Sequence, residues 1–158
     1  YTAAEFQGQK VSKSRIITSE KTSIVSIEYI DIYCANRGYN CTEFVLKKDA
    51  HSYYMMNIID YLIGNTDRHW GNWGFFADNT TNKLQGLYPL MDFNKSFLSY
   101  DTIEGAKCQT TDNRITQREA ALEAVKGIGL NQIHKIPEDW FADTIYRDMF
   151  FKRLELLK

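Results

Sequence analysis

The chain has 158 residues, a formal net charge of −1 and a 44% share of hydrophobic residues. A chain of this length typically forms one domain, and this composition can bury a proper core. The small net charge gives no electrostatic case for nucleic acid or an anionic membrane as a partner, and no apolar run reaches the length of a membrane span.

The three cysteines are odd in number and scattered, at positions 34, 41 and 108. This argues against a disulfide framework and predicts a reducing, cytoplasmic setting. The first residue is Tyr1, not Met, so we expect a piece of a longer chain.

Residues 1–19 carry β-branched residues on both sides of the turn-like Gln7-Gly8-Gln9, which predicts one or two strands. Residues 22–37 have apolar positions at helical spacing and predict a helix that Thr22 or Ser23 caps and Gly38 ends. Residues 39–48 are interpreted as a connector with a short apolar patch.

A second helix is predicted to open at Lys48-Asp49-Ala50, with Asp49 as its cap and Gly64 closing it in the left-handed conformation. Its apolar positions are Tyr53, Met56, Ile59, Leu62 and Ile63. After a polar loop at 64–72, residues 73–76 and 84–91 are typical of two strands joined by a turn at 78–82.

The C-terminal part begins with residues 94–113, which are polar and show no sustained period. Thr116 and Glu119 form a capping box for a helix through Val125 that Gly127 closes. Pro137 is predicted to start the last helix, whose apolar stripe is expected to be core, with a partner-binding helix as a minor alternative. The stripe consists of Trp140, Phe141, Ile145, Met149, Phe150 and Leu154.

The loop at 64–72 concentrates Asp, Arg, His and Asn between the predicted helix and the first strand of the hairpin. Asp67 precedes Asn72 by five positions, and Asp92 follows about twenty residues later, at the end of the return strand. Asp67 could accept the proton of an attacking hydroxyl, while Asn72 and Asp92 offer the hard oxygens that suit Mg²⁺. Each piece is common by chance, but all three in this order indicate phosphoryl transfer.

Two stretches resemble the catalytic and metal-binding motifs of HipA-like serine/threonine kinases: Gly64-Asn65-Thr66-Asp67-x-His69-x-x-Asn72 and Pro89-Leu90-Met91-Asp92-Phe93. The first is also similar to phosphatidylinositol-kinase loops. The resemblance covers about residues 50–97. It implies that Asp67 is the catalytic base, that Asn72 and Asp92 hold Mg²⁺ and the ATP cofactor, and that Asn65 and His69 support the loop. The family's second acidic position is Asn94 here, a departure that concerns the loop that follows.

The same resemblance implies an α+β fold in which residues 20–158 form the large, mostly helical C-terminal lobe of a protein-kinase-like fold, with a small β-hairpin carrying the catalytic loop. Residues 1–19 would be the end of the small lobe and the hinge, where adenine would lie. No strand-borne G-x-G-x-x-G loop and no Lys in a V-A-I-K-like strand are found. We therefore expect a small lobe supplied elsewhere, and an isolated chain that binds Mg-ATP weakly or not at all.

The resemblance also places an activation-type segment at 94–113. Its hydroxyls are candidates for phosphorylation, although an ordinary surface loop explains each of them as well. They are Ser96, Ser99, Tyr100, Thr102, Thr110 and Thr111.

Other interpretations of the loop remain open at this point. Asn65-Thr66-Asp67 could be a turn that bonds its own backbone. His69 is typical of a structural histidine, and Asp67, His69 and a Cys could hold zinc, although no Cys pair has ligand spacing. Arg68 could bind a phosphate or an acidic neighbour.

The expected function is ATP- and Mg²⁺-dependent transfer of phosphate to a protein Ser or Thr hydroxyl. The alternatives are a lipid or small-molecule kinase and, from a different class, a kinase-shaped docking module of a toxin–antitoxin or phage regulator. The sequence does not identify the acceptor.

Overall fold

The computed structural model describes residues 2–97, 102–112, 114–131 and 133–158. The described residues form four α-helices and two small antiparallel sheets, which is compatible with the predicted α+β class. The elements are β1 (Thr2–Phe6), β2 (Gln9–Lys13), β3 (Thr22–Ser26), α1 (Ile27–Ala35), α2 (Cys41–Ile63), β4 (Gly74–Asp78), β5 (Lys83–Leu87), α3 (Gln117–Ile128), the 3₁₀ turn η1 (Glu138–Trp140) and α4 (Thr144–Glu155). None of the helices in these ranges is long and apolar enough to cross a membrane.

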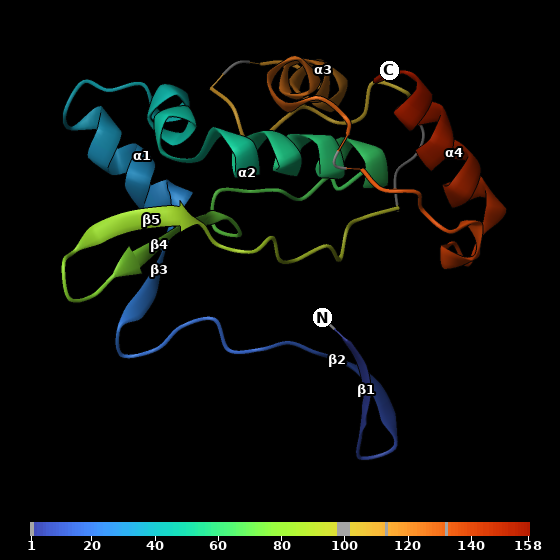
Figure 1. Cartoon of the computed structure of the whole chain (residues 1–158), viewed down its shortest axis with the longest axis horizontal. Coiled ribbons are helices and arrows are strands. Elements are labelled where there is room, and N and C mark those ends of the chain that lie inside the picture. Colours follow the sequence, from blue (N-terminus) through green and yellow to red (C-terminus); the bar gives the residue numbers. More distant parts are fainter. Residues whose placement is uncertain (1, 98–101, 113, 132) are drawn as a thin grey trace.

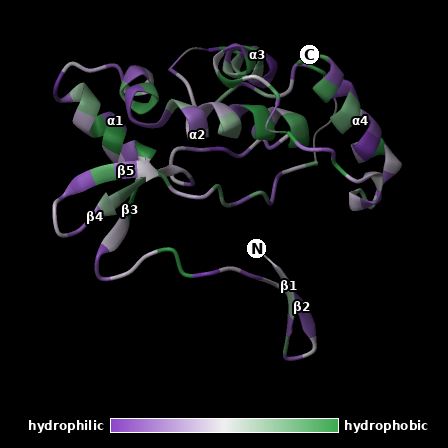
Figure 2. Ribbon diagram, viewed as in Figure 1, coloured by the Kyte–Doolittle hydropathy of each residue, from purple (hydrophilic) through white to green (hydrophobic). Residues whose placement is uncertain are grey.

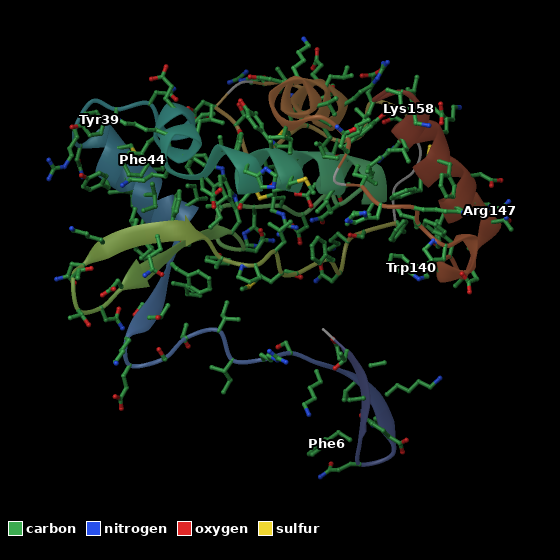
Figure 3. All side chains as sticks on the ribbon, in the orientation of Figure 1. Phe6, Tyr39, Phe44, Trp140, Arg147 and Lys158 are labelled. Carbon is green, nitrogen blue, oxygen red and sulfur yellow. The ribbon has the colours of Figure 1, made fainter. Side chains whose placement is uncertain are left out.

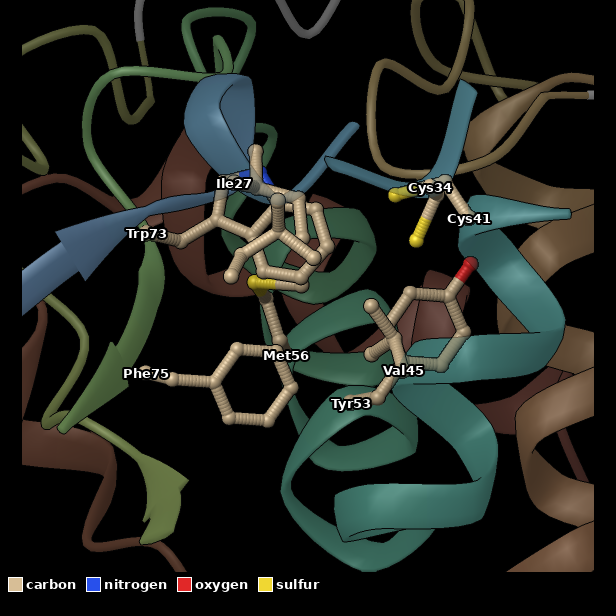
Figure 4. Packing of buried hydrophobic residues seen from close by; sticks show 9 residues of the cluster. Ile27, Cys34, Cys41, Val45, Tyr53, Met56, Trp73 and Phe75 are labelled. Carbon is tan, nitrogen blue, oxygen red and sulfur yellow. The ribbon is translucent and has the colours of Figure 1, made fainter. Parts of the chain in front are cut away.

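Helix α2 runs through the middle of the molecule, with the three-stranded sheet near its N-terminal part, α3 lying along it and α4 beside its C-terminal end (Figure 1). Its first part contributes to a hydrophobic core with α1 and the sheet, shown in Figure 4. Its last part contributes to a second core with α3 and α4. The polar loop at 64–72 leaves α2 where it enters this second core.

The N-terminal hairpin β1–β2 confirms the two predicted strands. Phe6 pairs with Gln9, and the turn residues Gln7 and Gly8 have φ angles of 52° and 74°. Two successive positive φ angles suit the twist of a tight hairpin. The hairpin lies apart from α2 (Figure 1), and Figure 3 shows its Phe6 side chain away from both cores.

The prediction of a helix over residues 22–37 is wrong for its first turn. Residues 22–26 form β3, which pairs antiparallel with β4. Thr22, Ile24 and Val25 are β-branched and suit a strand, whereas their spacing alone also fits a helix. Helix α1 begins after Ser26. The predicted hairpin is therefore part of a three-stranded sheet in the order β3-β4-β5, but its return strand ends at Leu87 and not at Met91, so Asp92 does not lie at the strand end.

The predicted connector at 39–48 is also wrong, because α2 already begins at Cys41. The side chain of Asn40 caps it by accepting a hydrogen bond from the Glu43 amide at 2.8 Å. Asp49 interrupts the helix with φ −156° and ψ 70°, and its Oδ1 accepts from the Ser52 amide at 3.1 Å. The predicted cap at Asp49 thus restarts a helix instead of starting one. Gly64 ends α2 with φ 62°, as predicted.

Towards the C-terminus the capping box of Thr116 and Glu119 is confirmed, but α3 runs through Gly127 to Ile128. Pro137 precedes the short turn η1 instead of the last helix, and Asp143 caps α4.

The predicted apolar stripe of the last helix is core only in part. Phe141, Phe150 and Leu154 belong to the second core. Trp140 and Ile145 are exposed, and they do not share one helix, because Trp140 ends η1 whereas Ile145 is the second residue of α4. Figure 3 shows Trp140 at the surface.

Asp49 links the kink of α2 to the sheet. Its Oδ2 accepts a hydrogen bond from the Leu87 amide at 2.9 Å. Burial raises the pKa of this carboxyl, but the Leu87 and Ser52 amides outweigh that effect and hold the pKa below its usual value. The carboxylate form therefore stabilises the fold above the ordinary Asp pKa of about 3.9 and loses that contribution as the pH falls through the lowered value.

We expect Asp49→Ala to lower the free energy of unfolding at pH 7 by about 1–2 kcal/mol, because two backbone amides lose their acceptor. The fall in stability between about pH 5 and 3 should also become shallower. Urea unfolding at several pH values measures both effects. Asp148→Ala, in an exposed ion pair on α4, is the control. An unchanged acid dependence in Asp49→Ala would contradict the assignment.

Candidate functional site

The polar loop starts from the buried C-terminal turn of α2. The Asn65 amide donates to the Asp60 carbonyl oxygen at 2.9 Å, and the left-handed Gly64 turns the chain back along the helix. At the far end of the loop, the Trp73 carbonyl oxygen accepts from the Ile27 amide at 3.0 Å. The loop is therefore fixed at both ends to helices.

A buried ion pair between Asp60 on α2 and Arg68 in the loop is the centre of the site. Arg68 Nε donates to Asp60 Oδ2 at 2.8 Å, and Nη2 donates to Oδ1 at 3.0 Å. The two side chains are only 2% and 5% exposed. Such a two-point contact is among the stronger charged interactions, and burial makes it costly to break.

The third nitrogen of Arg68 connects the loop to the chain leaving β5. Nη1 donates to the Met91 carbonyl oxygen at 2.7 Å and to the Asn72 carbonyl oxygen at 3.4 Å. The guanidinium carbon lies 5.0 Å from the centre of the Phe93 ring. Arg68 thus holds the residues on both sides of Asp92 against the loop. Of the two predicted partners for Arg68, a phosphate or an acidic neighbour, the structure shows an acidic neighbour, Asp60.

Asn65 is buried and connects α2 to Asp67. Its Nδ2 donates to Asp60 Oδ1 at 3.0 Å, and its Oδ1 accepts from the Asp67 amide at 3.2 Å. The Gln117 Nε2 of α3 donates to the Asn65 carbonyl oxygen at 2.5 Å. These contacts fix the backbone that carries Asp67.

His69 is exposed and makes a local contact. Its Nδ1 accepts a hydrogen bond from the Gly71 amide at 3.0 Å, inside the turn at 69–72. The contact is local to this turn, and the supporting role for His69 that the resemblance implies stays a prediction.

Asn72 is the most informative side chain of the loop. It is 4% exposed, and its Nδ2 donates to the Asp67 carbonyl oxygen at 2.6 Å. Its Oδ1 has no hydrogen-bond partner among the described residues. A buried amide oxygen without a protein partner costs stability unless water or a ligand satisfies it. Nε1 of Trp73, the next residue in the chain, also lacks a partner among the described residues, so this is a position where a ligand could bind.

The two candidate carboxylates differ in burial. Asp67 is half-buried and Asp92 is exposed, and neither carboxylate accepts a hydrogen bond from the described residues. The backbone of Asp92 has a φ of 57°, in the left-handed region. Residues other than glycine rarely adopt this conformation, although aspartate does so more often than most. Arg68 contacts the residues on both sides of Asp92 and directly follows Asp67 in the chain, so one arginine connects the two segments that carry the carboxylates.

The zinc interpretation finds no support within the described ranges. No group of three His, Cys, Asp or Glu side chains lies there in positions that could hold a metal ion. Asn72 and Asp92 do not form such a group, because they are only two residues and Asn72 carries a neutral amide.

The segment predicted to be of activation type packs against the loop. Trp70 Nε1 donates to the Gln109 carbonyl oxygen at 2.8 Å, and Gln109 Nε2 donates to the Thr66 carbonyl oxygen at 3.3 Å. Thr110 is buried and its hydroxyl donates to Asn57 on α2, so phosphorylation there would require the segment to open. Ser99 and Tyr100 lie outside the described residues.

An open pocket of about 740 Å³ lies between the N-terminal segment and the chain that leads to Asp92. One side is formed by residues 89–91, which directly precede Asp92. The other side carries two cations, Lys13 and Arg15. The full lining is Thr2, Lys13, Ser14, Arg15, Ile17, Pro89, Leu90 and Met91. The larger groove of about 910 Å³ beside α4 contains no residue of the loop.

The sequence interpretation missed Asp60 and Gln117. Asp60 lies four residues after Met56 and seven after Tyr53, so it falls on the buried stripe of α2. A carboxylate on such a stripe needs a partner, and that signal could have been used. Gln117 gives no comparable signal, because its contact depends on where α3 packs.

A comparison of the chain with protein-family models, with curated proteins and with solved structures found no match in any of the three. The chemistry of the loop is therefore inferred from its own contacts and from the motif in the sequence.

We expect Arg68→Met to lower the free energy of unfolding by about 3–5 kcal/mol, because Asp60 would be left charged and unpaired in the interior. Arg147→Met is the matched control, since its exposed ion pair with Asp148 should contribute at most about 1 kcal/mol. Urea unfolding measures both variants. Equal effects of the two substitutions would show that the buried pair does not hold the fold.

Proposed function

We propose that this chain carries the phosphoryl-transfer site of a HipA-like serine/threonine kinase, with ATP as the phosphate donor, Mg²⁺ as the metal and a protein hydroxyl as the acceptor. The fold would then be the large C-terminal lobe of a protein-kinase-like structure. Residues 1–19 would belong to the hinge side of the nucleotide.

The observation that carries this proposal is the state of the Asn72 side chain. One end of the amide is fixed to the backbone of Asp67, and the other end is a buried oxygen without a protein partner. A structural asparagine in a turn would be expected to use both ends. An asparagine that positions the base and also binds a cation uses one end for each task.

Asp67 would act as the base. Its backbone is held by Asn65 and Asn72, while its carboxylate is left available. As the acceptor oxygen attacks the terminal phosphorus and the bond from phosphorus to the leaving diphosphate breaks, the carboxylate would take the hydroxyl proton. Holding the backbone rather than the carboxylate leaves the reactive oxygens free to contact the acceptor.

Asn72 Oδ1 and the Asp92 carboxylate would hold Mg²⁺. Both are hard oxygen donors, and Mg²⁺ is commonly bound by one or two protein groups with phosphate and water completing its coordination. When bound, the ion supplies charge neutralisation at the transferred phosphate. Asn72 Oδ1, which is buried and has no hydrogen-bond partner among the described residues, is available to bind the ion.

The pocket beside residues 89–91 would accept the nucleotide. Its apolar residues Ile17, Leu90 and Met91 suit a planar base, and residues 89–91 in its wall directly precede Asp92 in the chain. This agrees with the expectation that adenine lies next to residues 1–19.

We expect Asp67→Asn to reduce phosphoryl transfer by roughly two to four orders of magnitude, the usual contribution of a positioned base. Intact mass of the full-length protein after incubation with Mg-ATP, with and without an added mixture of candidate acceptor proteins, measures transfer. Asp148→Asn, an exposed carboxylate on α4, is the control and should keep the wild-type rate. Phosphate gain in Asp67→Asn at the wild-type rate would exclude Asp67 as the base.

Two further results would favour the alternatives. Transfer to lipid or small-molecule acceptors alone would replace the protein acceptor. Partner capture that is unchanged in Asp67→Asn, together with no ATP binding, would favour a docking module.

Removal of the metal ligands gives a separate expectation. Asn72→Ala and Asp92→Ala should each weaken binding of Mg-ATP by about tenfold or more while affecting metal-free ATP much less, because Mg²⁺ binds through few protein oxygens. Calorimetric titration of the full-length protein with each ligand measures this difference. Asn131→Ala, at an exposed position between α3 and α4, is the control. Equal losses for Mg-ATP and free ATP would show that these oxygens do not bind the metal.

A further inference from the structure

Helix α1 has two apolar faces, and only one of them is used inside the protein. Ile27, Ile30 and Cys34 are buried in the first core. Tyr29, Ile32 and Tyr33, at positions i, i+3 and i+4, are 67%, 52% and 43% exposed. Figure 2 shows hydrophobic residues along much of α1. The charged residues of α1, Glu28 and Asp31, leave a second apolar stripe that the described part of the chain does not bury.

The exposed face, defined here by Tyr29, Ile32 and Tyr33, is held in place by its neighbours. The Tyr33 ring lies 6.0 Å from the Phe44 ring of α2, and the Arg37 guanidinium carbon lies 4.8 Å from the centre of the Tyr33 ring. Tyr39, also exposed, lies in the connection to α2 at the same end of the molecule (Figure 3). The face is therefore preorganised, which reduces the entropy cost of covering it.

We propose that this face is the interface of a two-fold symmetric dimer, in which α1 packs antiparallel against α1 of a second copy. The charges on the helix support a copy of this chain as the occupant. Glu28 lies near the N-terminal end of α1, the half-buried Asp31 lies at its middle, and Arg37 lies beyond its C-terminal end. A surface with opposite charges at its two ends is complementary to itself after a two-fold rotation.

The register of such a pair follows from the residue numbers. A two-fold axis midway between Ile32 and Tyr33 places Glu28 opposite Arg37 of the second copy. The same axis places Ile32 opposite Tyr33 of the second copy. One axis therefore satisfies both the apolar contact and the charge pairing. The net charge of −1 leaves little repulsion between the two copies.

The size of the face indicates a weak dimer. If an aromatic side chain is taken as about 200 Å², the three exposed residues present roughly 300 Å² of apolar surface. Interfaces that bury less than about 1,200 Å² in total are typical of transient association. We therefore expect a dissociation constant on the order of tens of micromolar rather than a permanent dimer.

Sedimentation velocity of the protein without nucleotide, from about 5 to 500 µM, brackets this range of affinity. We expect a shift from monomer to dimer with rising concentration, and at least a tenfold weaker association in Ile32→Glu. Ile145→Glu, at an isoleucine on α4 that is even more exposed than Ile32, should leave the association unchanged. Thermal unfolding confirms that both variants are folded. A protein that stays monomeric throughout, or a control that weakens as much as Ile32→Glu, would overturn the proposal.

Exchange of the charges tests the antiparallel register. Glu28→Arg or Arg37→Glu alone would place like charges opposite one another and weaken the dimer, while the double variant would restore opposite charges and recover the association. A double variant that is as weak as the single variants would exclude this register. The readout needs neither ATP nor an acceptor, so its outcome is independent of the proposed phosphoryl transfer.

Discussion

The buried contact between Asp60 and Arg68 is the interaction on which the rest of the loop depends. Two charges taken out of water are costly unless their hydrogen bonds are satisfied. Here the guanidinium donates to the Asp60 carboxylate and to the carbonyl oxygens of Met91 and Asn72. The C-terminal turn of α2, the loop and the chain after β5 therefore meet at one guanidinium, and none of them can move far without leaving a charge unpaired.

This arrangement separates the residues that hold the loop from those that could react. Asp60, Asn65 and Arg68 use their polar atoms inside the protein. Asp67 and Asp92 keep their carboxylates available, and Asn72 uses only its amide nitrogen. A site in which the supporting residues are satisfied and the reactive oxygens are not is preorganised for a ligand that brings its own charges.

The sequence predicted local features well where short-range chemistry decides them. The left-handed Gly64, the turn at 78–82 and the capping box of α3 depend on residues within a few positions of one another. The predicted start of α1 was wrong because the apolar spacing around Ile24 fits both a strand and a helix. Only the pairing of this segment with β4 decides that it is a strand. The candidate residues of the loop were found from their spacing, but their tie to Asp60 was not, since it depends on packing.

The interruption of α2 at Asp49 has a consequence for how the protein opens. The residues before the kink contact α1, whereas the last turns contact α3 and α4. The stretch from Tyr53 to Leu62 contributes to both cores, so its amides should exchange with solvent most slowly, while those of residues 41–48 can exchange through a smaller, local opening. The two parts of α2, before and after Asp49, would then belong to different cooperative units, and the loop is attached to the more stable one.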